Sequence, residues 1–389
     1  MAILVGVPAE TYPGERRVAM TPRAMDMLAK SGLEILVERG AGAEAGFPDS
    51  EYEEKGARII ADRDELFRAS NIILHVRMAG ANPAAGRADL PRYRRGQTVI
   101  GFGEPLSGAA EYADLAECGL NCFAMELIPR ITRAQSMDAL SSMATVAGYK
   151  AVLLAANELP RMFPMLMTAA GTITPARVFV LGAGVAGLQA IATARRLGAM
   201  VSAYDIRPAV REQVESLSAK FVFIELEAGE SEDRGGYAKA LGEAFYRKQR
   251  ELLTEVVRQH DIVITTAAVP GQKAPLLITR DMVQGMAPGS VIVDLAAERG
   301  GNCELTVAGE TVTQTGVTIM GPLNLPSSVP YHASQMYSRN VAALLKHLVR
   351  DGTLAIDLAD EITRETLVTA TGEIVHPRVR QLLDSPLIG

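Results

Sequence analysis

One segment near the middle of the chain constrains the fold more than any other. It begins with the apolar run Arg177-Val-Phe-Val-Leu181, passes through three glycines at the spacing G-x-G-x-x-G, and continues into a helix-forming stretch that ends near Ala194. A strand, a tight glycine turn and a helix in this order let a helix N-terminus and its backbone amides approach a pyrophosphate. The pattern predicts a dinucleotide-binding unit; the alternative is a glycine turn that serves only helix–sheet packing.

The residues that follow favour the dinucleotide hypothesis. A second strand-like run ends in Asp205, where a ribose-binding acid is expected. A carboxylate there accepts bonds from both ribose hydroxyls and repels a 2′-phosphate, which favours NAD over NADP. Arg207 could partly neutralise such a phosphate, or could form only a surface ion pair.

Composition excludes several classes of protein. The chain has 389 residues, of which 48% are hydrophobic and 22% charged, enough for two or three domains. A net charge of -6 argues against a nucleic-acid partner. The apolar runs 162–176 and 178–194 are too interrupted to span a membrane, and no basic stretch precedes the apolar N-terminal residues. We therefore expect a cytoplasmic chain with no membrane span of its own.

The cysteines and histidines show no metal-site spacing. The three cysteines are too few and too scattered for a disulfide framework, and the five histidines match no zinc motif. We expect buried, reduced thiols and no metal.

Strand-like and helix-like runs alternate in two series. The first series has strand-like runs at 3–7, 34–38, 71–76, 98–102 and 121–125, with helices expected at 22–30 and 109–118. A long helical segment at 137–159 leads to the second series, whose strand-like runs are 178–181, 201–204, 221–224, 261–265 and 291–294. Nearly continuous apolar strands separated by helices are typical of parallel sheets covered on both faces. The expected fold class is α/β, with two Rossmann-like, doubly wound parallel-sheet domains.

A helix expected at 331–350 could return to pack on the first domain. The expected division is an N-terminal domain of residues 1–128 plus 322–389 and an NAD-binding domain of residues 129–321. We expect the cofactor in a cleft between them, at the carboxyl ends of the strands. The candidate cofactor-binding residues lie in the glycine turn and just after the later strands: Gly182, Ala183, Gly184, Val185, Ala186, Gly187, Asp205, Ile206, Arg207, Ala267, Ala268, Asp294 and Leu295.

A second polar segment runs from Pro129 to Ser142. Gln135, Asp138 and Ser141 are three residues apart and share one face wherever the segment is helical, and Arg130 could pair with Asp138. The alternative is a helix start at which Ser136 or Asp138 caps free amides.

One connection is longer than most in an α/β domain. Residues 225–239 are acidic and contain Gly235, Gly236 and Tyr237. The segment could be a lid with a glycine hinge and a tyrosine that closes on a nucleotide, or a solvated loop.

Several motifs, in order, resemble the NAD-binding component of proton-translocating NAD(P) transhydrogenase, known as its alpha subunit or domain I. They cover nearly the whole chain and lie at 13–19, 125–142, 168–178, 182–194, 235–239, 273–279 and 294–298. The resemblance implies that Arg130, Gln135, Asp138 and Ser141 position the nicotinamide and its ribose, and that Tyr237 belongs to a closing lid.

The resemblance also implies a reaction and its partners. Members of that family pass a hydride directly from NADH on this component to NADP on a separate component, coupled to proton movement through a membrane component. NAD(H) would be the cofactor and NADP(H) the co-substrate on the partner subunit. The chain would be a peripheral, homodimeric subunit at the cytoplasmic face of the inner membrane.

Two other functions stay open. Alanine dehydrogenase, a relative by fold, uses a lysine and a histidine near the positions of 74–79 and 99–104; this chain has Arg77 and Met78 in the first stretch and no histidine in the second. His75 could still donate a proton, although a buried, satisfied histidine is the simpler interpretation. A non-catalytic NAD-binding regulatory module would keep the glycine turn but would not need the segment around Gln135.

Overall fold

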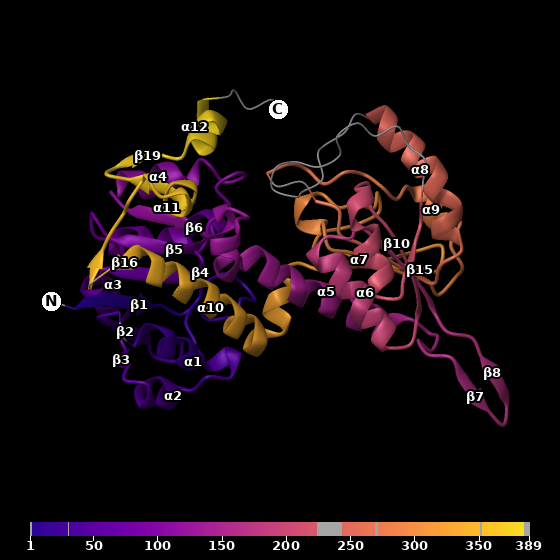
Figure 1. The fold of residues 1–389 in the computed structure, drawn as a ribbon, viewed down its shortest axis with the longest axis horizontal. Coiled ribbons are helices and arrows are strands. Elements are labelled where there is room, and N and C mark those ends of the chain that lie inside the picture. Colours follow the sequence, from indigo (N-terminus) through magenta and orange to yellow (C-terminus); the bar gives the residue numbers. More distant parts are fainter. Residues whose placement is uncertain (1, 30, 224–242, 269–270, 351, 385–389) are drawn as a thin grey trace. The chain divides into compact units, whose positions relative to one another are not determined.

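The computed structural model describes residues 2–29, 31–223, 243–268, 271–350 and 352–384. The chain forms two compact units: residues 1–143 with 327–389 are unit 1, and residues 144–326 are unit 2. Each unit contains a mainly parallel sheet with helices packed against it (Figure 1).

Unit 1 is built on an eight-stranded sheet in the order β19-β18-β6-β5-β4-β1-β2-β3. The six strands from β1 to β6 run parallel in the doubly wound order 3-2-1-4-5-6, while β18 and β19 add an antiparallel edge. The central strands β4 and β5 are almost entirely buried, because their Ile, Leu and Val side chains face helices on both sides. The strand bounds are Ile3–Val7 (β1), Leu33–Glu38 (β2), Arg58–Ile60 (β3), Ile72–Arg77 (β4), Thr98–Phe102 (β5), Asn121–Ala124 (β6), Leu367–Ala370 (β18) and Glu373–Ile374 (β19).

The longest helix that lies wholly in unit 1 is α10, Pro330–Leu348. It was expected from the sequence at 331–350 and ends two residues earlier, where Val349 becomes extended. The helix expected at 22–30 is instead a single turn, α1 (Pro22–Met25), followed by a 3-10 turn at Asp26–Leu28. The other helices of unit 1 are α2 (Asp49–Glu54), α3 (Arg63–Ala69), α4 (Glu111–Glu117), α11 (Glu361–Thr366) and α12 (Pro377–Asp384).

Unit 2 repeats the doubly wound order in a seven-stranded sheet, β11-β10-β9-β12-β13-β15-β14. Only the edge strand β14 is antiparallel. The strand bounds are Arg177–Leu181 (β9), Met200–Tyr204 (β10), Lys220–Phe221 (β11), Ile262–Thr265 (β12), Val291–Asp294 (β13), Thr311–Gln314 (β14) and Val317–Met320 (β15). The helices are α6 (Val185–Arg196), α7 (Arg211–Ser216), α8 (Glu243–Arg258) and α9 (Arg280–Gln284).

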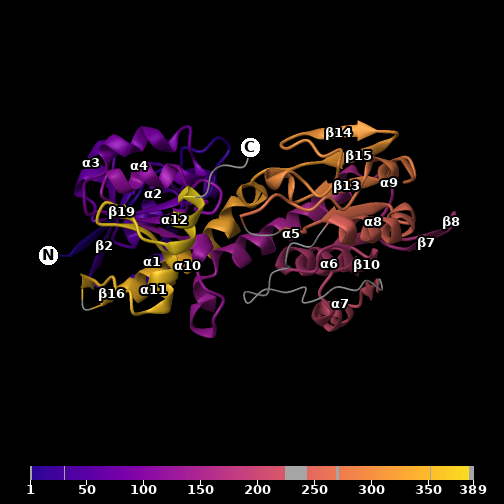
Figure 2. The same cartoon turned by 90° about the horizontal axis from the view of Figure 1, so that it is seen from above.

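Strand β9 shows why this sheet is covered on both faces. Val178 and Val180 pack into one hydrophobic core, whereas Phe179 and Leu181 pack into another on the opposite face. Residues of α6 line the first core and residues of α8 and α9 line the second (Figure 2). The predicted α/β class with two doubly wound parallel-sheet domains is confirmed.

The boundaries between the units differ from the expected ones at 128/129 and 321/322. Residues 129–143 belong to unit 1, where the Asn340 side chain of α10 donates a hydrogen bond to the Ser136 carbonyl. Residues 322–326 belong to unit 2, where the Asn324 amide donates to Glu298 and Leu325 packs into the core. Tertiary hydrogen bonds of this kind leave no local pattern in the sequence.

Helix α5, Ala139–Glu158, begins in unit 1 and ends in unit 2. In the part of the chain that the structure describes, it is the one helix long and apolar enough to cross a membrane by length and composition. The sequence analysis considered two other apolar runs and missed this one. The finding is weak evidence for a span, because core helices pass the same test and Ala151, Val152 and Ala155 are fully buried in the core of unit 2.

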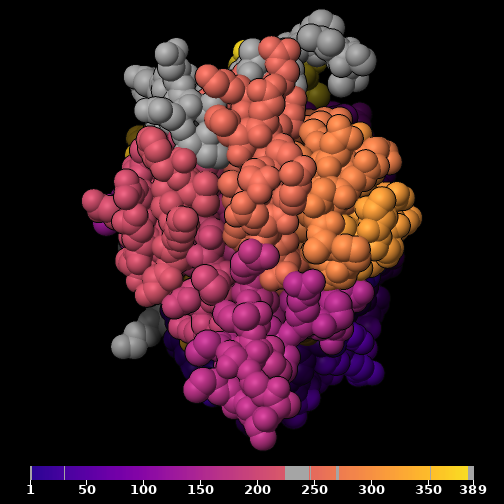
Figure 3. All heavy atoms as spheres, turned by 90° about the vertical axis from the view of Figure 1, so that its right-hand side faces the viewer, coloured from indigo at the N-terminus to yellow at the C-terminus, as the bar shows by residue number. Residues whose placement is uncertain are grey.

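A two-stranded hairpin, β7 (Leu166–Thr168) with β8 (Gly171–Ile173), projects from the rest of unit 2 (Figures 1 and 3). Met165 and Met167 on this segment are 60% and 79% exposed. The hairpin adds an apolar surface to unit 2 that its own core does not cover.

Candidate nucleotide-binding site

The glycine turn links the end of β9 to the start of α6. Gly182 adopts φ +96°, a conformation that favours glycine, and a Cβ there would lie 2.6 Å from the Thr266 hydroxyl oxygen. At Gly187 a Cβ would lie 1.9 Å from the Gly182 carbonyl oxygen, so only glycine lets α6 pack this closely on the strand. Two of the three glycines therefore have steric reasons inside the protein itself.

Gly184 has a different environment. It is the N-cap residue of α6, and a Cβ built on it would meet no atom within 4 Å. Open space beside a helix N-terminus is where a dinucleotide fold receives a pyrophosphate. The turn therefore fits a dinucleotide, and packing alone does not explain Gly184.

Asp205 follows β10 and lies beside the turn. Its Oδ2 accepts a hydrogen bond from the Ala183 amide at 2.7 Å, which ties the second strand to the glycine turn. Arg207 donates to both carboxylate oxygens through Nε and Nη2, at 2.9 and 2.8 Å. The Asp205 and Arg207 side chains are only 5% and 12% exposed, so their ion pair is largely buried. Arg207 thus pairs with the acid that the sequence assigned to the ribose.

The ends of β12 and β13 complete this edge of the sheet. The Thr266 hydroxyl donates to the Gly182 carbonyl oxygen at 3.0 Å and so supports the turn. Asp294 is fully buried and accepts hydrogen bonds from the Thr265 and Thr306 hydroxyls and from the backbone amides of Ala296, Asn302 and Cys303. Asp294 was predicted to bind the cofactor, but its buried, bonded carboxylate instead holds the loop that follows β13.

Asn302 is a residue that the sequence reasoning missed. Its amide nitrogen donates to the carbonyl oxygens of Ala267 and Pro275, both at 2.9 Å, and its oxygen accepts from the Ala267 amide at 3.1 Å. Asn302 therefore fixes Ala267, whose nitrogen lies 3.3 Å from the Cβ position of Gly182. The only sequence signal was the Gly300-Gly301 pair before it, both with positive φ.

The structure brings the predicted residues of unit 2 to one edge of the sheet. Ala183 and Gly187 are buried, Ala268 is exposed, and the others not yet described are half-buried: Val185, Ala186, Ile206, Ala267 and Leu295. All of them follow the carboxyl ends of β9, β10, β12 and β13, where ligands of doubly wound sheets bind.

The polar segment of unit 1 folds as a 3-10 turn, Thr132–Met137, that runs into α5. Asp138 accepts hydrogen bonds from the Ser141 amide at 2.8 Å and the Ser141 hydroxyl at 2.6 Å. This is the capping arrangement left open by the sequence, and it brings Asp138 and Ser141 together. The side chains of Arg130 and Gln135 are exposed. Tyr237 lies outside the described residues.

His75 lies on β4 and is 4% exposed. Its Nε2 is 3.1 Å from the Tyr93 hydroxyl and its Nδ1 is 3.6 Å from the Glu10 carboxylate. Both ring nitrogens therefore face partners inside unit 1. This geometry supports the structural interpretation of His75 over a role as a proton donor to a substrate.

Glu126, just after β6, carries a carboxyl group in an unusual environment. Its Oε1 accepts the amides of Gly103 and Glu104 at 2.7 and 2.8 Å, while its Oε2 is buried with no hydrogen-bond partner among the described residues. Burial, and next the charge of Glu104, raise the pKa of Glu126 from 4.5 to about 8. Folding therefore favours the neutral acid, and this contribution, complete below pH 4.5, is lost as the pH rises through 8.

We expect Glu126→Gln to remove this pH dependence, because glutamine keeps the accepting oxygen and stays neutral. At pH 9 the variant should be more stable than the wild type by on the order of 2–4 kcal/mol, with little difference at about pH 4.5. Calorimetric unfolding at both pH values measures this, with the exposed Glu117→Gln as control. Parallel pH profiles for the wild type and the Glu126 variant would contradict the assignment.

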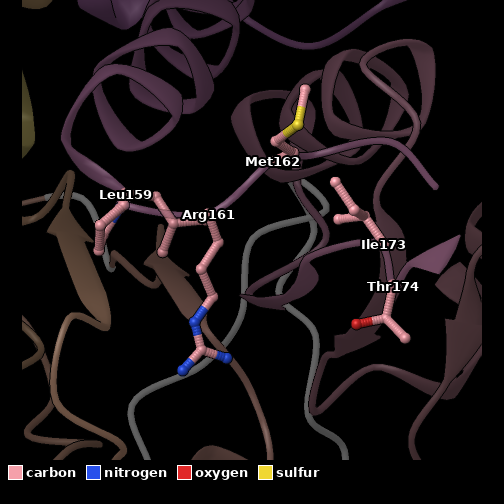
Figure 4. A pocket seen from close by; sticks show the side chains of 6 residues that line it. Leu159, Arg161, Met162, Ile173 and Thr174 are labelled. Carbon is pink, nitrogen blue, oxygen red and sulfur yellow. The ribbon is translucent and has the colours of Figure 1, made fainter. Parts of the chain in front are cut away.

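A separate pocket lies at the base of the β7–β8 hairpin. It has a volume of about 560 Å³, and Figure 4 shows Leu159, Arg161, Met162, Ile173 and Thr174 around it. Arg161 donates to Asp261, which immediately precedes β12, at 2.7 Å. The pocket is therefore at the amino ends of the strands, away from the glycine turn. Among the described residues, no group of histidine, cysteine or acidic side chains is arranged to hold a metal ion.

Comparison with known proteins agrees with this geometry. Family models described as "Alanine dehydrogenase/PNT, N-terminal domain" and "Alanine dehydrogenase/PNT, C-terminal domain" match residues 6–147 and 151–377. NAD(P) transhydrogenase subunit alpha of Cereibacter sphaeroides is 46% identical over 96% of this chain and 71% of its own length. In Rhodospirillum rubrum, the first portion of a divided NAD(P) transhydrogenase subunit alpha is 44% identical over 96% of this chain and 98% of its own length.

A solved structure shows the same fold. The transhydrogenase from Sinorhizobium meliloti superposes with a TM-score of 0.82 at 43% identity, covering 96% of this chain and 99% of that chain. Similarity of this extent includes both units and the segments that carry the glycine turn and Gln135. The chain belongs to the alanine dehydrogenase/PNT family and resembles, over nearly its whole length, the NAD(P) transhydrogenase alpha subunits of that family.

Proposed function

We propose that this chain is the NAD(H)-binding subunit of a proton-translocating transhydrogenase. In this role it presents NADH for direct hydride transfer to NADP+ bound on a separate subunit. The observation that carries the proposal is that a dinucleotide turn with open space at Gly184 occurs in a chain whose His75 is buried and bonded to partners. The family also includes alanine dehydrogenases, so this local chemistry has to discriminate between the two reactions.

The residues of unit 2 would bind and select the nucleotide. The N-terminus of α6 and the turn amides would hold the pyrophosphate, and the Asp205 carboxylate would accept the adenosine-ribose hydroxyls. The Asp205–Arg207 pair would disfavour a 2′-phosphate, because Asp205 already neutralises the guanidinium. Thr266 and Asn302 would keep the edge of the sheet rigid around the ligand.

Bound NADH supplies the hydride, and the chain's task is orientation. Transfer between two nicotinamide rings needs no proton donor at a substrate carbonyl, so amide and hydroxyl groups are sufficient. Gln135 would orient the nicotinamide, and Arg130 and Ser141 would position the ring and its ribose. Asp138 would act through the start of α5, which it caps.

The partners follow from the same proposal. An NADP-binding subunit and a membrane-spanning subunit would complete the enzyme, and this chain would be peripheral to the cytoplasmic face of the membrane. We also propose that the chain is a homodimer, which the exposed methionines of the hairpin favour because exposed apolar side chains commonly mark interfaces.

The decisive experiment mixes the purified chain with an NADP-binding component and follows reduction of an NADP analogue by NADH. Parallel reactions use NADPH as donor, and alanine with NAD and no second component. We expect transfer from NADH, at least about tenfold less from NADPH, and none with alanine. Turnover with alanine alone would establish the amino-acid dehydrogenase alternative. Tight NADH binding without either turnover would establish the regulatory module.

A further inference from the structure

Gln135 is exposed on a short 3-10 turn, and both of its neighbours are tied to the body of unit 1. We refer to residues Thr132–Met137 as the Gln135 turn. Hydrogen-bond geometry in 3-10 segments is poorer than in α-helices, so a turn of this length needs support from outside itself. The structure provides that support at Arg133 and at Ser136.

The first support is an ion pair. Arg133 Nη1 lies 2.6 Å from Asp360 Oδ2. The other oxygen of Asp360 caps α11 through the amides of Ile362 and Thr363, and it lies 3.0 Å from His347 Nε2. Burial alone would raise the pKa of Asp360, but the Arg133 hydrogen bond and the capping amides lower it to about 2, so the carboxylate stays ionised. Arg133 is thus held by an acid that two other elements also fix.

The second support is a side-chain amide. Asn340 Nδ2 on α10 donates to the Ser136 carbonyl at 2.9 Å, and Asn340 is 6% exposed. Asn340 and His347 are seven residues apart and so lie on one face of α10. One face of a long helix therefore contributes to both supports, and Gln135 lies between the two supported residues.

We propose that Asn340 and the Arg133–Asp360–His347 cluster are positioning residues for Gln135. They hold the exposed amide in the orientation that hydride transfer requires, and they touch no ligand themselves. The inference rests on the proposed function. Its physical basis is that a displacement of about 1 Å in an orienting group can cost about 100-fold in rate.

The test compares Asp360→Asn, Asn340→Ser and Arg133→Met in the full-length chain. Asparagine still caps α11, so Asp360→Asn removes the charge and leaves the helix start intact. The matched control is Asp357→Asn, an exposed carboxylate three residues earlier that bonds only to the Ala359 amide among the described contacts. The readouts are amide hydrogen exchange of residues 132–138, the dissociation constant for NADH, and the rate of transfer to an NADP analogue on the second component.

We expect exchange at 132–138 to rise about tenfold in each of the three variants and the transfer rate to fall about tenfold. NADH affinity should stay within about twofold, and the control should change neither quantity. Arg133→Lys should recover some of the rate lost in Arg133→Met, because lysine can still pair with Asp360.

Unchanged exchange at 132–138 would overturn the inference, and so would increased exchange with an unchanged transfer rate. A wild-type chain that binds NADH but transfers no hydride would refute the proposed function and, with it, any positioning role in transfer. In that case the exchange measurement alone would still decide whether these residues hold the turn.

Discussion

Gly187→Ala is expected to weaken NADH binding at least about 100-fold, the largest effect on affinity that a single methyl group should produce in this chain. The new Cβ would lie 1.9 Å from the carbonyl oxygen and 2.9 Å from the carbonyl carbon of Gly182. Both are backbone atoms, so no side-chain rotation relieves the contact and α6 must move away from β9. The displaced helix N-terminus would then no longer meet the phosphates. Overpacking of this kind also costs about 1–3 kcal/mol of stability.

Two other glycines make this result interpretable. Gly184→Ala meets no atom within 4 Å, so it should leave stability nearly unchanged and weaken only NADH binding. Gly285→Ala, in the same unit, has φ -78° and its closest contact is the flexible Arg258 side chain at 3.1 Å, so both quantities should stay near wild type. Isothermal titration with NADH and thermal unfolding of the three variants separate these outcomes. Wild-type affinity in Gly187→Ala would show that the turn does not hold the nucleotide.

The sequence was sufficient to predict the two sheets because their strands are encoded locally. The run Val178-Phe-Val-Leu181 buries alternate residues on opposite faces, and such runs separated by helices specify a parallel sheet covered on both faces. Predictions were weakest where few residues form an element. The strand expected at 221–224 is described only as Lys220–Phe221, and the helix expected at 22–30 breaks after one turn.

The supports of the candidate site could not be predicted, because their partners are far apart in the chain. Asn340 and Ser136 are 204 residues apart, and Arg133 and Asp360 are 227 apart. Asp294 illustrates the opposite case: its position after a strand predicted a ligand-binding acid, but the polar groups of the following loop surround it in the folded chain. Spacing indicates which edge of a sheet a residue occupies, and only tertiary contacts decide whether the side chain faces a ligand or supports a loop.

Gln135→Asn is expected to lower the rate of hydride transfer about 100-fold while changing the NADH dissociation constant by less than about threefold. The substitution keeps the amide and removes one methylene, so the orienting group retreats by about 1.5 Å from a turn whose backbone Asn340 holds in place. An orienting contact made mainly in the transition state affects the rate more than the affinity. Single-turnover transfer to an NADP analogue and equilibrium titration with NADH measure the two quantities separately.

The matched control is Gln259→Asn, which shortens an exposed glutamine that bonds to Glu255 in unit 2. It should leave both the rate and the affinity unchanged. If Gln135→Asn instead reduces rate and affinity by the same factor, Gln135 contributes binding that the ground state and the transition state share, and its role is to hold NADH rather than to orient it. If neither changes, the amide faces solvent throughout the reaction, and the supports at Arg133 and Ser136 stabilise unit 1 without positioning a reacting group.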